Sequence, residues 1–207
     1  MKLLLSSKGL ANEELTENYL SFVGTKRKVS IITTASNDYK ERNKNVIKLN
    51  KKLNDLGFIT KFIDIEFDDP KDLKKSEIVI INGGNPYYLL HHIKRSNSEN
   101  ILYELISDKM PIWGISAGFM ILMQDLGIMD LLTPEMNSIG LMHKECLGLI
   151  KEIVIPHYDR FIKEGKILKK DIDKYEMESE RKIVRLGEFQ CLNYEGNKFK
   201  KVGEIIE

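Results

Sequence analysis

The chain has 207 residues, enough for one domain with a sizeable core, and its 42% hydrophobic and 30% charged residues exclude a disordered polypeptide. Its 32 basic residues against 31 acidic ones leave a net charge of +1, which argues against nucleic acid as the main partner. No apolar run approaches the ~20 residues of a membrane-spanning helix. We therefore expect a single domain over residues 1–207 that does not enter a membrane.

The cysteines and the first residues bear on where the protein works. Cys146 and Cys191 lie far apart and do not have the spacing of a metal site. The apolar part of residues 1–8 is shorter than the ~7–15-residue core of a signal peptide. We expect a cytoplasmic protein with free thiols and with no metal or other cofactor. The sequence leaves the oligomeric state open, with a homodimer as one option.

Apolar segments of strand length alternate with amphipathic segments of helix length through the first 123 residues. Strands are expected at 2–6, 28–33, 58–64, 77–82 and 111–115, and helices at 12–22, 38–56, 87–94, 101–107 and 117–123. This alternation predicts a mostly parallel sheet covered by helices on both faces, with ligands at the carboxyl ends of its strands.

The remainder of the chain is expected to be less regular. A loop-rich stretch at 127–144 precedes a strand at 149–156 and an amphipathic charged segment at 161–170. Three short antiparallel strands follow at 182–186, 188–193 and 198–202, with Glu195-Gly196-Asn197 as the last turn.

The pentapeptide Gly114-Ile115-Ser116-Ala117-Gly118 lies between a predicted buried strand and a predicted buried helix. A serine in this G-x-S-x-G context stands on a sharp strand-to-helix turn, which requires glycine beside it. Ser116 is therefore the candidate nucleophile, and the amide of Ala117 is a candidate oxyanion donor.

A serine nucleophile needs a base, and His157 is the candidate because it follows a strand at the same sheet edge. We expect His91, His92 and His143 to be structural or exposed. The acid that orients the base should lie between Ser116 and His157. Spacing alone leaves both Asp130 and Glu135 open, while Asp125 should point away; Glu145 also falls in this stretch.

Gly83 and Gly84 follow the fourth predicted strand and let a backbone N–H approach a substrate, so they are candidates for a second oxyanion donor. Asn85, next in this turn, is also a candidate oxyanion or substrate-binding residue. The same turn can cap the next helix, with Asn85 at the cap and Pro86 in the first turn, and both roles can hold together.

Three ordered motifs, Asn82-Gly-Gly-Asn85, Gly114-Ile-Ser-Ala-Gly118 and Ile155-Pro-His-Tyr158, resemble the peptidase E (aspartyl dipeptidase) and cyanophycinase-like serine peptidases. The closing stretch from Arg185 to Leu192 also resembles that family. The resemblance implies a three-layer αβα sandwich like that of class I glutamine amidotransferases, with the antiparallel strands as a small extension. It implies a Ser-acid-His triad of Ser116, Glu135 and His157, because Glu135 fits the family's spacing before the histidine.

The resemblance also implies hydrolysis of dipeptides or short peptides through an acyl-enzyme, without a cofactor. Peptidase E uses an arginine after the histidine to read an N-terminal Asp, but Lys169, Lys170 and Asp171 occupy the comparable stretch here. Arg160 is the remaining candidate for an acidic first side chain, ahead of Lys163 and Lys166. The alternatives are an esterase of the α/β-hydrolase type and a non-catalytic binding protein on the same fold.

Overall fold

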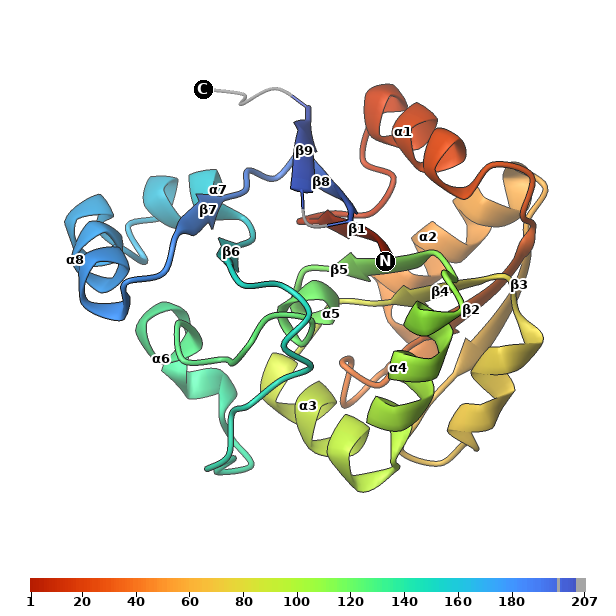
Figure 1. Cartoon of the computed structure of the whole chain (residues 1–207), viewed down its shortest axis with the longest axis horizontal. Coiled ribbons are helices and arrows are strands. Elements are labelled where there is room, and N and C mark those ends of the chain that lie inside the picture. The colour runs from red at the N-terminus through yellow and green to blue at the C-terminus, as the bar shows by residue number, and fades with distance from the viewer. Residues whose placement is uncertain (197, 204–207) are drawn as a thin grey trace.

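The computed structural model describes residues 1–196 and 198–203, and its main feature is a seven-stranded sheet of order β3-β2-β4-β5-β1-β8-β9 (Figure 1). The first five strands in this order run parallel, and β8 and β9 join antiparallel. The strands of this sheet are β1 (Lys2–Ser6), β2 (Lys28–Ile32), β3 (Ile59–Ile63), β4 (Ile78–Ile81), β5 (Ile112–Ile115), β8 (Cys191–Glu195) and β9 (Lys198–Val202).

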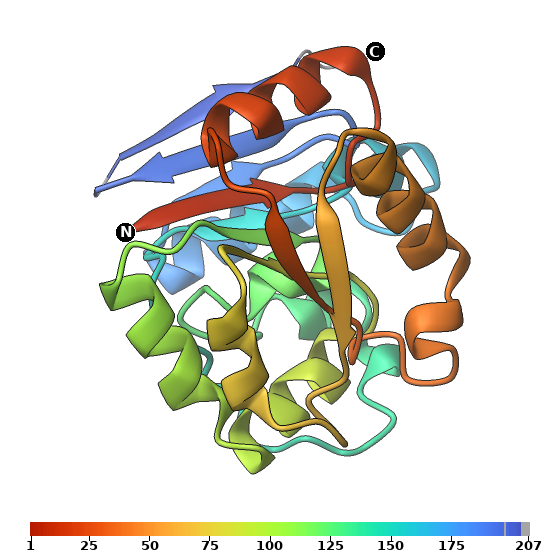
Figure 2. The same cartoon turned by 90° about the vertical axis from the view of Figure 1, so that its right-hand side faces the viewer.

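Helices cover both faces of the sheet, with α1 and α2 on one face and α3, α4 and α5 on the other (Figure 2). The α-helices are α1 (Glu13–Val23), α2 (Lys44–Asp55), α3 (Pro86–Arg95), α4 (Ser98–Ser107), α5 (Ala117–Met120), α6 (Met129–Leu132), α7 (Tyr158–Lys163) and α8 (Lys169–Ser179). Short 3-10 turns are η1 (Lys40–Arg42), η2 (Pro70–Lys75) and η3 (Pro134–Met136).

Strand β4 shows why its residues must all be apolar. Ile78 and Ile80 join the core under α1 and α2, while Val79 and Ile81 join the core under the opposite helices. All four side chains are fully buried. A strand whose alternating side chains enter two different cores reads as a continuous apolar run, which is typical of a central parallel strand.

The carboxyl ends of the parallel strands meet at one edge of the sheet. Ser6 at the end of β1 lies beside Ile115 at the end of β5, and Ile32 of β2 lies beside Ile81 of β4. The indole Nε1–H of Trp113 in β5 donates to Ser6 Oγ in β1 over 2.8 Å, which links these two strands inside the core. The loops that leave this edge carry Ser7, Gly83 and Ser116.

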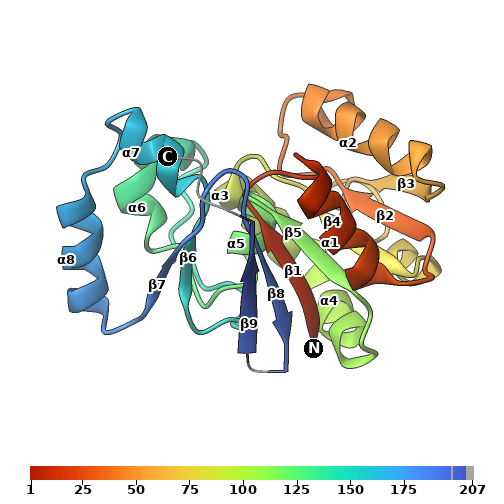
Figure 3. The same cartoon turned by 90° about the horizontal axis from the view of Figure 1, so that it is seen from above.

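A second, two-stranded sheet stands beside the first and consists of β6 (Ile153–Ile155) and β7 (Ile183–Arg185), with α7 and α8 between them in sequence (Figure 3). These strands pair in parallel. The prediction that residues 182–186 form an antiparallel strand of the C-terminal group was therefore wrong. A parallel pair needs a long crossover, and α7 and α8 supply it.

The α/β class, the mostly parallel sheet with helices on both faces and the antiparallel C-terminal strands are confirmed. The segment expected as one helix over 38–56 is divided into η1 and α2, with Asn43 capping α2 through Asn45 N–H. The strand expected at 188–193 begins only at Cys191. The predicted turn at residues 195–197 includes Asn197, which lies outside the described residues.

Within the described ranges, none of the helices combines the length and apolarity needed to cross a membrane. Cys146 and Cys191 are both buried and not joined in a disulfide.

We expect Gly118→Ala to destabilise the protein by at least about 3 kcal/mol, because an alanine Cβ there would lie 1.8 Å from the Ile81 carbonyl oxygen. Gly140→Ala is the control: its φ of +64° strains an alanine, but no atom lies within 4 Å, so the cost should be about 1 kcal/mol. Urea unfolding of both variants measures the difference. Equal losses would show that the contact between α5 and β4 is not tight.

Candidate active site

Ser116 occupies a strained turn between β5 and α5, with φ 50° and ψ −117°. Such a positive φ is uncommon for a residue other than glycine and is held here by close packing. A Cβ on Gly114 would lie 2.5 Å from Phe119 Cα, and a Cβ on Gly118 would lie closer still, 1.8 Å from the Ile81 carbonyl oxygen. The two glycines of the pentapeptide are therefore required sterically, as the sequence predicted.

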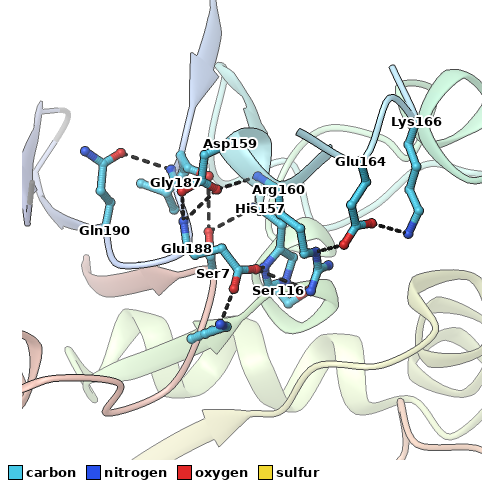
Figure 4. Close-up of polar contacts among 12 residues, drawn as sticks. Ser7, Ser116, His157, Asp159, Arg160, Glu164, Lys166, Gly187, Glu188 and Gln190 are labelled. Atoms are coloured by element: carbon cyan, nitrogen blue, oxygen red, sulfur yellow. Dashed lines mark hydrogen bonds and ion pairs between the residues drawn. The ribbon is translucent and has the colours of Figure 1, made fainter. Parts of the chain in front are cut away.

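His157 follows β6 and also has a left-handed backbone, with φ 56° and ψ 28°. Its ring Nε2 lies 3.0 Å from Ser116 Oγ (Figure 4). Its backbone N–H donates to Ser7 Oγ over 3.0 Å, and that hydroxyl donates in turn to the Leu186 carbonyl. The loop after β1 therefore holds the end of β6 beside the end of β7, and with it the imidazole beside Ser116.

The acid beside His157 is Glu188, whose Oε1 makes a short contact with His157 Nδ1 (Figure 4). Glu135, the residue chosen from family spacing, does not occupy this position: it is exposed in η3. The assignment of Glu135 as the orienting acid is corrected to Glu188.

Two of the other candidate acids, Asp130 and Asp125, have partners elsewhere. Asp130 pairs with Lys144 at 2.5 Å and accepts from Tyr87 Oη at 3.0 Å. Asp125 pairs with Arg181 at 2.6 Å. Both are held in contacts that fix the loops after α5, so neither is available to His157.

The loop from β7 to β8 positions Glu188. Its backbone N–H donates to both carboxylate oxygens of Asp159, and Gln190 Oε1 accepts from Gly187 N–H over 3.0 Å. The sequence predicts residue 188 in a strand, and the acid is expected between Ser116 and His157, so Glu188 was not among the candidates. A signal was available: Gly187-Glu188 follows a short apolar strand, and carboxyl ends of parallel strands gather at one edge.

The proposed oxyanion residues divide into two groups. Gly83 and Gly84 line the cleft at Ser116, and a Cβ on Gly83 would lie 3.1 Å from Ser116 Cβ. Ala117 begins α5 directly after the serine. Asn85 does not line the cleft. Its Oδ1 caps α3 by accepting from the backbone N–H groups of Tyr87 and Tyr88. Its own backbone N–H donates to Ala35 O, and its Nδ2 donates to Met136 O. Asn85 is therefore structural.

Two cations lie against Glu188. Lys8 Nζ pairs with Oε2, and Arg160 Nη1 lies 3.3 Å from Oε1, the oxygen that also contacts His157. Both side chains line the cleft and are about 40% exposed, at 43% for Lys8 and 40% for Arg160. Arg160 thus lies at the site, while its neighbours Lys163 and Lys166 do not line the cleft.

The cleft at Ser116 has a volume of about 510 Å³. Its walls come from the loop after β1, from α2, from the Gly83–Gly84 turn, from the nucleophile turn and from the start of α7. It includes both Ser116 and His157. The arrangement can hold a small substrate against an activated serine.

Comparison with known proteins agrees with this geometry. The model of peptidase family S51 matches residues 3–202. The chain belongs to peptidase family S51. The members of this family are serine-type peptidases, which are hydrolases.

Among curated proteins, the chain is 26% identical over 113 residues to an uncharacterized peptidase of Listeria monocytogenes and 25% identical over 113 residues to one of Listeria innocua. Each match covers 53% of this chain, and about half of the relative, 55% and 54%.

Two crystal structures share the fold of this S51 chain. A protein of Listeria monocytogenes assigned to peptidase E superposes with a TM-score of 0.79 and 22% identity, covering 97% of this chain and 96% of its own. A peptidase from an acI-B1 actinobacterium gives 0.73 and 21%, covering 98% and 87%. At these identities the likeness concerns the fold.

Burial lowers the pKa of His157 below its ordinary value of 6.5, and the charge of Arg160 lowers it further, against the opposing effect of Glu188. Burial acts to raise the pKa of Glu188, but the hydrogen bond from Lys8 and the facing imidazole outweigh it, so that pKa is lowered. His157 therefore remains neutral, and able to accept a proton, at a lower pH than an exposed histidine.

We expect Arg160→Gln to raise the pKa of His157, because it removes a nearby positive charge, and Glu188→Gln to lower it, because it removes a negative one. Nuclear magnetic resonance titration of the His157 ring measures both shifts. Lys163→Gln, on the same helix but outside the cleft, is the control and should leave the midpoint unchanged. Shifts of one sign for both cleft variants would contradict the assigned contacts.

Proposed function

We propose that the protein is a serine peptidase that hydrolyses dipeptides or short peptides through an acyl-enzyme. Ser116 is the nucleophile, His157 the general base and Glu188 the acid that orients it. The continuous contact from Ser116 Oγ through the imidazole to the Glu188 carboxylate supports this proposal most strongly. The three side chains have the roles that acyl transfer requires.

In the proposed reaction Ser116 Oγ attacks the scissile carbonyl carbon while His157 Nε2 takes the hydroxyl proton. The imidazolium then gives this proton to the leaving amine as the C–N bond breaks. A water molecule, deprotonated by His157, attacks the acyl-serine. As the ester bond breaks, the imidazolium returns this proton to Ser116 Oγ, which releases the acid and restores the hydroxyl and the neutral imidazole. Glu188 stabilises the imidazolium in both halves and fixes the tautomer that leaves Nε2 free to accept.

The backbone N–H groups of Ala117 and of the Gly83–Gly84 turn are the proposed oxyanion donors. The turn lies against Ser116 because Gly83 has no side chain, and Gly84 has a φ of +150° that brings it close to Ala35 O. Donors fixed in the backbone need no rearrangement when charge develops on the oxygen, which is why such sites accelerate acyl transfer.

The cleft also bears on the substrate. Its volume of about 510 Å³ suits a short peptide rather than a folded protein. Arg160 reaches the cleft with a side chain that is 40% exposed, so it can meet an acidic first side chain while remaining near Glu188. We include a preference for an acidic N-terminal residue in the proposal on this basis.

A dipeptide panel tests this function directly. Wild type should hydrolyse Asp-Leu with a higher kcat/KM than Ala-Leu or Lys-Leu, and Ser116→Ala should lose about 10⁶ in rate because the nucleophile is gone. Labelling of wild type, but not of Ser116→Ala, by a fluorophosphonate should confirm a reactive serine. Short acyl esters in the same panel separate peptidase from esterase.

Near-normal turnover by Ser116→Ala would remove the nucleophile assignment. Absence of both labelling and turnover in wild type would favour a non-catalytic binding protein. Equal kcat/KM for the three dipeptides would remove the acidic preference alone.

Glu188→Gln should reduce kcat by about 10⁴, the loss seen when the orienting acid of a triad becomes an amide. Glu135→Gln is the matched control and should retain wild-type kcat, because Glu135 is exposed in η3. Circular dichroism checks that both variants are folded. The reverse pattern would restore Glu135 as the triad acid.

A further inference from the structure

The charges that line the cleft are all of one sign. Four cationic side chains reach it, and among the residues that the structure describes no carboxylate lines it; the four are Lys8, Lys48, Lys52 and Arg160. A substrate in this cleft meets a positive surface whichever way it lies. The four cations are not equivalent, however, because two of them, Lys8 and Arg160, form ion pairs with Glu188.

Lys48 and Lys52 form the other pair and come from α2. Figure 3 shows α2 and α7 on either side of the carboxyl ends of the central strands, so these lysines belong to a different wall from Arg160. Residues four apart share one face of a helix. Leu49, which lies between these two lysines in the sequence, is buried and also lines the cleft, so this face of α2 is directed toward the cleft.

The ammonium groups of Lys48 and Lys52 have hydrogen-bond donors that are not used within the described part of the chain. Lys52 Nζ gives one hydrogen bond, to the Leu10 carbonyl over 2.9 Å. Lys48 is exposed, and in the described part of the chain it makes no ion pair and no hydrogen bond. An ammonium has three donors, so Lys48 can offer three and Lys52 two to a ligand. No carboxylate within residues 1–196 and 198–203 forms an ion pair with either of them.

Every unmodified peptide brings one anion to such a wall, the carboxylate at its C-terminus. We propose that Lys48 and Lys52 bind the C-terminal carboxylate of the substrate, an inference that rests on the proposed peptidase function. This subsite recognises the leaving-group end, whereas Arg160 faces the acyl end. It also limits substrate length, because each added residue moves the carboxylate up to ~3.6 Å farther along the chain.

Binding to the inert Ser116→Ala variant tests the subsite without turnover. Calorimetry at low salt compares Asp-Leu with its C-terminal amide, which differs in the carboxylate charge alone. We expect the free acid to bind about tenfold tighter, since charge-assisted hydrogen bonds are stronger than neutral ones. In Ser116→Ala/Lys48→Gln the advantage should shrink, and with Lys52→Gln added it should vanish.

Lys51→Gln in the same Ser116→Ala background is the matched control. Lys51 is an exposed residue of α2 that pairs with Asp55 and does not line the cleft, so the preference for the acid should persist. Lys48→Glu adds a stricter test, because its carboxylate opposes Lys52 and should remove more of the acid's advantage than Lys48→Gln does. This variant leaves Lys52 unchanged, whose bond to the Leu10 carbonyl also supports the loop.

Equal affinity for acid and amide, or an advantage that survives in the double lysine variant, would overturn the subsite. The subsite would also be overturned if Lys48→Gln weakened the binding of Asp-Leu but not that of Ala-Leu, because Lys48 would then bind the acidic side chain. Hydrolysis of both Asp-Leu and its amide by wild type, with equal kcat/KM, would overturn the subsite and leave the peptidase function standing. Absence of hydrolysis would remove the function, while the calorimetry would still decide the subsite.

Discussion

The approach of α5 to β4 and β5 governs the geometry at Ser116. Gly118 lies so close to the Ile81 carbonyl that no side chain fits, and Gly114 meets Phe119 in the same way. Because the helix begins this close to the strands, the backbone at Ser116 has no room for an ordinary φ. The hydroxyl is therefore held at the sheet edge by this packing together with the backbone of Ser116, whose N–H donates to Ser6 O and whose carbonyl accepts from Phe119 N–H.

The proposed triad is divided between two sheets. Ser116 belongs to the seven-stranded sheet, whereas His157 and Glu188 follow the two parallel strands of the smaller one. The Ser7 hydroxyl joins them, because it accepts from His157 N–H and donates to the Leu186 carbonyl. Asp159 completes the smaller unit by accepting from Glu188 N–H, so the base and its acid are positioned together.

The sequence predicted the features that arise from local chemistry. Apolar runs and helical spacing were enough for the parallel sheet, and the pentapeptide and His157 were enough for two of the three residues that come together. Glu188 was missed because its place depends on β7, and β7 pairs in parallel with β6 across α7 and α8 rather than antiparallel with the strand that follows it, β8. Pairing across such a crossover leaves no short-range signal, and family spacing pointed instead to the exposed Glu135.

The two edge strands of the seven-stranded sheet also determine how the chain can meet a second copy. Strand β9 presents exposed Lys198, Lys200 and Lys201, and β3 at the other edge contains Lys61. Lysines on an edge strand oppose pairing with an edge of the same kind, because their charges repel and need water. The seven-stranded sheet is thus protected at both edges against growing from one molecule into the next.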